Sequence, residues 1–212
     1  FVDARKLSGV VRSRIVARDF NDGYQEGVFA GTPDVVVFNI QMSDLAEDRR
    51  LCAMTVDAVS AFLQSPIYRE NGDENHRTVV RPPSGEDPGY LWDLDGALPG
   101  LRTASRSWHD KQTAEFVEMG FESCDLDGQA WKHKTNYNQK MENHGDDSFV
   151  IGYVEGMLKL KREFEQRFDC NCSELIGLAP GMLREGSFLK RRFGVTDFGW
   201  WEEADEKHSK KL

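Results

Sequence analysis

The sequence predicts an α+β fold, an antiparallel sheet backed by helices. Short segments rich in β-branched and aromatic residues recur along the chain, and between them apolar residues recur at helical spacing. Strands that interleave with helices packed on one face imply this class and not a doubly wound parallel sheet. At 212 residues, with 39% hydrophobic residues, the chain is long enough to bury one core or two closely packed subdomains.

In the first third of the chain, residues 9–18 alternate apolar and polar positions, which predicts a strand with basic side chains on one face. Thr32 and Pro33 resemble an N-cap followed by proline at the first helical position. An apolar strand is then expected to end at Asp57, within the stretch 55–63. The helix between these strands is expected to bury Val35, Phe38, Met42 and Ala46.

The middle of the chain contains two further short strand candidates, residues 78–80 and 90–94, the first ended by two prolines. A helix is expected to start near Thr103 and to end at Gly120, because glycine favours the backbone conformation that terminates helices. Its predicted buried side carries Trp108, Phe116 and Met119.

In the last third, residues 133–148 are polar and predict a loop, whereas the apolar run 149–154 predicts a strand. Residues 187–189 and 198–201 are expected to form the two arms of a closing hairpin. Between the strand and this hairpin, a helix is indicated by the spacing of Met157, Leu160, Phe164 and Phe168.

Composition excludes several classes of protein. A net charge of −9 argues against a surface that coats nucleic acid, so any such binding must be local. No apolar run approaches the roughly 20 residues of a membrane span, and no signal segment opens the chain, so no membrane partner is expected. The four cysteines fit a reducing compartment and lack zinc-site spacing. The chain ends without a closing element, and we expect it to be a piece of a longer protein.

Asp57 is the most informative residue. It follows an apolar run, and Phe62 comes five residues later. The stretch resembles a polymerase palm, in which an acid in this position can hold the catalytic metal and an aromatic ring at this offset can lie under the sugar of the incoming nucleotide. The alternatives are an ordinary turn or cap residue for Asp57 and a core aromatic for Phe62.

Other segments accompany Asp57 in a fixed order. They are RSRIVARDF (12–20), FAGTP (29–33), VDAVSAFL (56–63), RPPSG (81–85), ALPGLRTASRSW (97–108), Gly120-Phe121 with Asp125 or Asp127, and SFL (187–189). Together, over nearly the whole chain, they resemble the reverse transcriptase of Ty1/copia-type retrotransposons.

This resemblance implies one reverse transcriptase domain over residues 1–212, with polymerase palm and fingers interleaved and no complete thumb or ribonuclease H. The family adds dNTPs to the 3′-hydroxyl of a DNA primer on an RNA template, with two Mg²⁺ ions held by convergent carboxylates; Mn²⁺ is an alternative. The domain would belong to a Gag-Pol-type polyprotein, in a cytoplasmic particle or the nucleus.

By resemblance, Asp57 and Glu155 are the catalytic, metal-binding acids. The family pattern Tyr-Val-Asp-Asp is Tyr153-Val154-Glu155-Gly156 here, so one acid is a methylene longer and the other is missing. A helix pattern follows directly, so roughly ten residues of a return strand are missing near 156–158. We therefore expect impaired polymerase activity. Asp146 and Asp147 lie at the other end of the strand and are expected to be a solvated loop.

The resemblance also implies a nucleotide-binding and template-binding surface. Pro99 and Ala104-Ser105 depart from the family pattern in the loop that would underlie the nucleotide. Two other interpretations stay open: a nucleic-acid-binding remnant without chemistry, and an unrelated acidic α+β interaction domain. The residues expected to bind substrate are Phe62 as the sugar gate, Gly100 and Arg102 under the nucleotide, and Arg12, Arg14 and Arg18 on phosphates.

Overall fold

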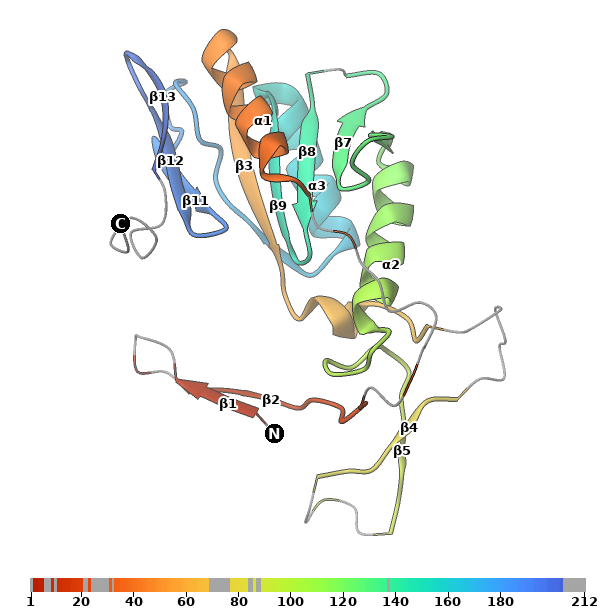
Figure 1. Ribbon diagram of the computed structural model, residues 1–212. Coiled ribbons are helices and arrows are strands. Elements are labelled where there is room, and N and C mark those ends of the chain that lie inside the picture. Colours follow the sequence, from red (N-terminus) through yellow and green to blue (C-terminus); the bar gives the residue numbers. More distant parts are fainter. Residues whose placement is uncertain are drawn as a thin grey trace. The chain divides into compact units, whose positions relative to one another are not determined.

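The computed structural model describes residues 2–5, 9, 11–20, 23, 31, 33–68, 77–83, 86, 89–136 and 138–203 (Figure 1). The chain divides into two compact units, unit 1 with residues 1–30 and 60–113 and unit 2 with residues 31–59 and 114–212. The predicted α+β class is confirmed, because the described residues form three α-helices and four sheets whose paired strands are all antiparallel.

Unit 1 holds two small sheets and a 3-10 helix. Strand β1 (Val2–Arg5) pairs with β2 (Val11–Arg14), so the strand predicted over residues 9–18 is shorter than expected. Strands β4 (Val79–Val80) and β5 (Trp92–Asp93) lie where the sequence predicts them and pair with each other. The 3-10 helix η1 (Ala61–Gln64) carries Phe62.

Unit 2 is built on a six-stranded sheet with the order β10-β3-β9-β8-β7-β6. Strand β3 is the predicted Asp57 strand, and β9 is the predicted apolar strand. The bounds are β3 (Leu51–Ala58), β6 (Phe121–Ser123), β7 (Ala130–His133), β8 (Lys140–His144), β9 (Asp147–Tyr153) and β10 (Cys170–Cys172).

The loop predicted over residues 133–148 is wrong, because β8 and the start of β9 occupy much of it. The two strands are joined by a two-residue turn, with His144 opposite Asp147 in the ladder. Gly145 takes a φ of +66° in this turn, a conformation that glycine adopts without steric cost.

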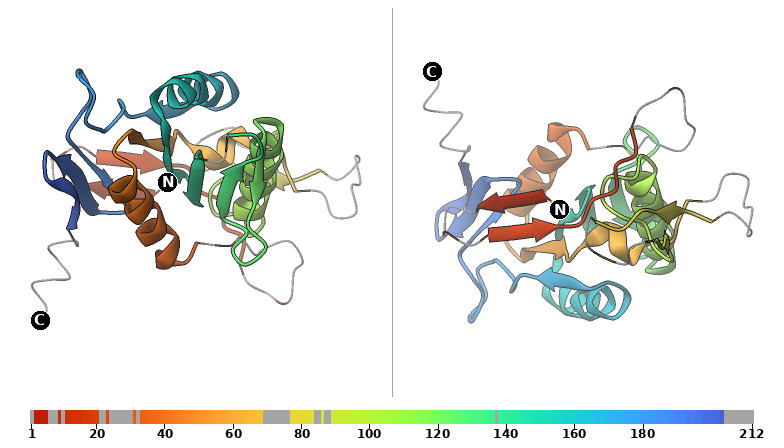
Figure 2. Two further views of the ribbon diagram at one scale, coloured as in Figure 1. Left: turned by 90° about the horizontal axis from the view of Figure 1, so that it is seen from above. Right: turned by 90° about the horizontal axis from the view of Figure 1, so that it is seen from below.

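Helices cover both faces of this sheet, and not one face as predicted (Figure 2). Helix α1 (Val35–Glu47) packs on the face that carries Ala53 and Phe149, and α3 (Val154–Arg167) on the face that carries Gly152. The N-cap of α1 is Asp34, whose side chain accepts a hydrogen bond from Val36 N; Thr32 lies outside the described residues. The buried residues of α1 are Phe38, Gln41, Met42 and Leu45, whereas Val35 and Ala46 are exposed.

Helix α2 (Ala104–Glu118) and α3 bury the aromatic residues that the sequence predicts. Gly120 follows α2 with a φ of +91°. In unit 2, the Phe116 ring meets Trp131 edge-on at 5.3 Å and Phe164 at 6.0 Å between ring centroids. These contacts form the core on the α3 face of the sheet.

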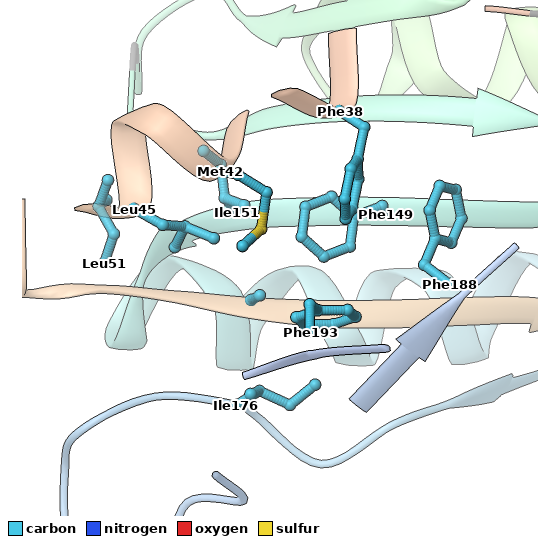
Figure 3. Packing of buried hydrophobic residues seen from close by; sticks show 10 residues of the cluster. Phe38, Met42, Leu45, Leu51, Phe149, Ile151, Ile176, Phe188 and Phe193 are labelled. Atoms are coloured by element: carbon cyan, nitrogen blue, oxygen red, sulfur yellow. The ribbon is translucent and has the colours of Figure 1, made fainter. Parts of the chain in front are cut away.

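A second core lies on the α1 face, where a three-stranded sheet of β11 (Glu185–Phe188), β12 (Arg191–Thr196) and β13 (Gly199–Glu203) joins it. The predicted closing hairpin is wrong, because β12 lies between its two arms and pairs with both. Phe38 and Met42 point from α1 toward Phe149 and Ile151 of β9 (Figure 3).

None of the helices among the described residues has the length and the apolar composition that a membrane crossing requires.

Candidate functional site

Asp57 lies near the end of β3 in a row of polar residues. In the antiparallel ladders it stands opposite Asn171 of β10 on one side and Asp147 of β9 on the other, and Asp147 stands opposite His144 of β8. Residues directly opposite each other in such ladders project from the same face of the sheet. The polar row Asn171–Asp57–Asp147–His144 therefore crosses four strands on the α1 face.

The row concentrates negative charge. Burial raises the pKa of Asp147, and the charges of Asp146 and Asp57 add to this effect. Sequence reasoning placed Asp146 and Asp147 in a solvated loop and missed their proximity to Asp57. The signal that could have found it is the antiparallel class itself, because an acid at the end of one strand meets the start of an antiparallel neighbour.

Glu155 lies at the opposite end of the same ladder. It is exposed in the first turn of α3, two residues after Tyr153, and Tyr153 stands opposite Leu51 at the start of β3. The six residue-to-residue steps from Leu51 to Asp57 span about 20 Å at strand spacing. A single Mg²⁺ holds its ligands at about 2 Å. The structure therefore does not bring together the two acids that were expected to share a metal.

The physical reason is the direct pairing of β9 with β3. The chain enters α3 at Val154 without a return strand after β9. A return strand between β9 and β3 would make β9 parallel to β3, since each neighbouring pair would be antiparallel. The end of β9, with Glu155, would then lie beside Asp57. Without the return strand, Glu155 lies at the opposite end of the β3–β9 ladder from Asp57.

Near the Leu51 end of the ladder, a hollow of about 410 Å³ is lined by polar groups. Its basic residues are both paired: Lys140 Nζ lies 2.6 Å from Asp44, and Arg50 Nη2 lies 2.7 Å from Asp48. The side-chain hydrogen bond from Arg50 holds the pKa of Asp48 well below its usual range. With Glu47 as a further acid in the lining, the hollow offers little attraction for a triphosphate.

In unit 1, the segments expected to bind nucleotide and template are tied together. Ala17 N donates a hydrogen bond of 2.7 Å to Pro99 O, and Arg102 N donates one of 2.9 Å to Asp19 Oδ2. Gly100 lies between these bonds with a φ of +94°, and a Cβ there would overlap the Ala17 carbonyl oxygen. The close approach that Gly100 permits is thus to the chain's own basic segment.

The other substrate-binding candidates lie on the same unit. Phe62 is half-buried in η1, and the Ser65 hydroxyl donates to its carbonyl oxygen at 2.7 Å. Arg14 and Arg18 are exposed, and Arg12 pairs with Ala4 in the β1–β2 ladder. Unit 1 therefore carries all six substrate candidates, whereas Asp57 and Glu155 belong to unit 2.

The Arg102 guanidinium is engaged within unit 1. Its Nη2 atom donates a hydrogen bond of 2.8 Å to the carbonyl oxygen of Gly23.

A buried carboxyl group lies on the α1 face of β8. Glu142 is 2% exposed and stands opposite Phe149. Burial raises its pKa to about 8, the charge of Asp127 adds to the effect, and Arg191 opposes it. The folded protein therefore keeps Glu142 protonated at neutral pH, where the unfolded chain, with an ordinary pKa of 4.5, does not.

We expect the contribution of Glu142 to stability to be full below about pH 4.5 and to be lost as the pH rises to about 8, because the unfolded chain alone releases the proton in this range. The slope for this one group reaches about 1.4 kcal/mol per pH unit. Chemical denaturation across this pH range should show that the free energy of unfolding falls less with rising pH in Glu142→Gln than in the unchanged protein. Glu202→Gln, at an exposed position, is the control; equal losses in all three proteins would contradict the expectation.

Within the described part of the chain, no group of three or more His, Cys, Asp or Glu side chains is arranged to hold a metal ion. The chain matches no model of a known protein family, and no curated protein matches it.

Proposed function

We propose that the chain is a copia-type reverse-transcriptase-like domain that binds nucleic acid and has lost nucleotidyl transfer. The observation that carries the proposal is the position of Asp57 and Glu155 at opposite ends of the β3–β9 ladder. Two-metal catalysis needs acids that converge on metals about 4 Å apart. Acids about 20 Å apart cannot supply this arrangement.

The retained binding is assigned to unit 1. The basic segment with Arg14 and Arg18 and the loop around Gly100 resemble the family's contacts to template and nucleotide, and the Ala17–Pro99 hydrogen bond holds them side by side. Unit 1 carries 11 Lys and Arg against 12 Asp and Glu, whereas unit 2 carries 16 against 24. Repulsion of phosphates is therefore weaker in unit 1, where binding would be local and sensitive to salt.

Primer extension tests the loss of chemistry. The chain is incubated with an RNA template, a labelled DNA primer, all four dNTPs and either Mg²⁺ or Mn²⁺. We expect no extension of the primer, while an active reverse transcriptase extends it under the same conditions. Extension that disappears in Asp57→Asn would overturn the proposed loss, because it would show that Asp57 still serves catalysis.

Binding of a labelled RNA–DNA hybrid at low salt tests the retained function. We expect the double variant Arg14→Ala/Arg18→Ala to bind at least tenfold more weakly. Its plot of log affinity against log salt should flatten by about 0.7 to 0.9 for each lost phosphate contact.

The matched control is Arg77→Ala/Arg81→Ala, which removes the same charge from exposed positions of the same unit. It should change affinity much less. Equal losses in the two double variants would mean that net charge, and not the basic segment at 11–18, determines binding.

A second candidate is an acidic α+β interaction domain unrelated to polymerases. The excess of acidic residues in unit 2 favours it. The hybrid-binding experiment separates the two, because the electrostatic attraction is strongest at low salt. Failure to bind the hybrid there would support the interaction domain.

A further inference from the structure

Cys170 and Cys172 bring two thiols together at the edge of the six-stranded sheet. They are the first and last residues of β10, the edge strand beside β3. Residues two apart in a strand project from the same face, here the α3 face. The two Sγ atoms lie 3.8 Å apart, within thiol hydrogen-bond distance, and both residues are partly buried.

We propose that Cys170 and Cys172 form a two-thiolate chelate for a thiophilic divalent cation of the Zn²⁺ and Cd²⁺ class. A tetrahedral Zn²⁺ ion with Zn–S bonds of about 2.3 Å places its sulfur ligands about 3.8 Å apart, which is the separation found here. An ion bound linearly between the two thiolates, with bonds of the same length, would need the sulfur atoms to lie about 4.6 Å apart. The thiols therefore suit a tetrahedral ion without rearrangement.

A disulfide between the same residues fits less well. The Cα atoms of residues two apart in a strand are separated by about 6.6 Å, near the upper limit for disulfides. The Sγ atoms would also have to approach to about 2.05 Å, which requires a distortion of β10. An ion placed between the sulfurs spans the gap that a direct bond would have to close.

The charges around the thiols favour a cation. Burial raises the pKa of Cys170, and the nearby carboxylates of Glu165, Asp169 and Asp57 raise it further. Burial also raises the pKa of Cys172, while Lys161, which forms an ion pair with Glu174, lowers it. The same negative field that opposes thiolate formation attracts a divalent ion.

Binding releases protons, since each thiol must ionise. Two S–H bonds break, two metal–sulfur bonds form, and two protons pass to solvent, with no change of oxidation state. Because no third His, Cys, Asp or Glu joins these thiols in a metal-holding group among the described residues, the other two positions of the ion are open to water or an added ligand. This proposal is independent of nucleic-acid binding.

Titration of the reduced full chain with Cd²⁺ tests the site through the ultraviolet charge-transfer absorption of cadmium–thiolate bonds. We expect one ion per chain, an apparent affinity that rises with pH by up to about a hundredfold per unit, and at least a tenfold loss in Cys170→Ser or Cys172→Ser. Cys124→Ser, at an exposed cysteine outside β10, is the matched control and should bind as the unchanged chain does.

X-ray absorption on the unchanged chain counts the sulfur ligands directly and does not depend on the folding of any variant. Two sulfurs per ion are expected. One sulfur per ion, four sulfurs with one ion per two chains, or unchanged binding in Cys170→Ser/Cys172→Ser would each overturn the intrachain chelate.

Discussion

Phe149→Ala should lower the free energy of unfolding by about 3–5 kcal/mol, the usual cost of truncating a buried phenylalanine. Phe149 is fully buried in β9, and its ring lies 4.9 Å from Phe38, 5.5 Å from Phe188 and 5.1 Å from Phe193, measured between centroids. These partners come from α1 and from the three-stranded sheet, so the cavity would disrupt three elements together. Chemical denaturation of the full chain, followed through the unfolding of unit 2, measures the loss in the free energy of unfolding.

Phe198→Ala is the matched control, because the Phe198 side chain is fully exposed in the β12–β13 turn. Phe198→Ala deletes the same phenyl ring from a solvent-exposed position and should change the free energy of unfolding by less than about 0.5 kcal/mol. If Phe149→Ala destabilised the protein no more than Phe198→Ala, the α1 face would not be a packed core.

Gly100→Ala should destabilise unit 1 by more than about 2 kcal/mol. Alanine at a φ of +94° has a backbone cost of about 1–2 kcal/mol. The added Cβ would also overlap the Ala17 carbonyl oxygen and lie 3.0 Å from the Ala17 nitrogen, so the Ala17–Pro99 hydrogen bond could not keep its geometry. Thermal unfolding and limited proteolysis report the effect.

Gly89→Ala separates the clash from the backbone strain. Gly89 has a φ of +88° in the same unit, and a Cβ there would meet nothing within 4 Å. Gly89→Ala should therefore lower the free energy of unfolding only by the backbone cost of alanine at a positive φ. Equal effects of the two substitutions would mean that the loop around Gly100 does not pack on Ala17. A loss of hybrid binding in Gly100→Ala alone would connect this packing to the proposed function.

The strands and helices with a strong local pattern could be predicted from the sequence. The apolar run of β9 and the regular spacing of Met157, Leu160 and Phe164 on α3 have few other interpretations. Strand β8 could not be predicted, because it buries Glu142 and Asn143. Asn143 is satisfied by Gln129 and Ser148, and no local property of a polar segment reveals such partners.

The candidate site could be predicted only in part, for a related reason. The place of Asp57 near the end of a strand follows from the local sequence, and the structure confirms it. Its neighbours depend on which strand pairs with β3 and in which direction, which is set by long-range contacts. The resemblance to reverse transcriptases placed Glu155 beside Asp57, an arrangement that needs a return strand which residues 147–167 do not contain. In the structure, Asp147 stands opposite Asp57 instead.

If the proposed loss of nucleotidyl transfer holds, the direct β3–β9 ladder also limits which changes could restore activity. Changing Glu155 and Gly156 to aspartates would restore the letters of the family motif but leave both new acids at the wrong end of the sheet. On this proposal, polymerisation would instead require an insertion long enough to add a strand between β9 and β3, which would reverse the direction of β9 relative to β3.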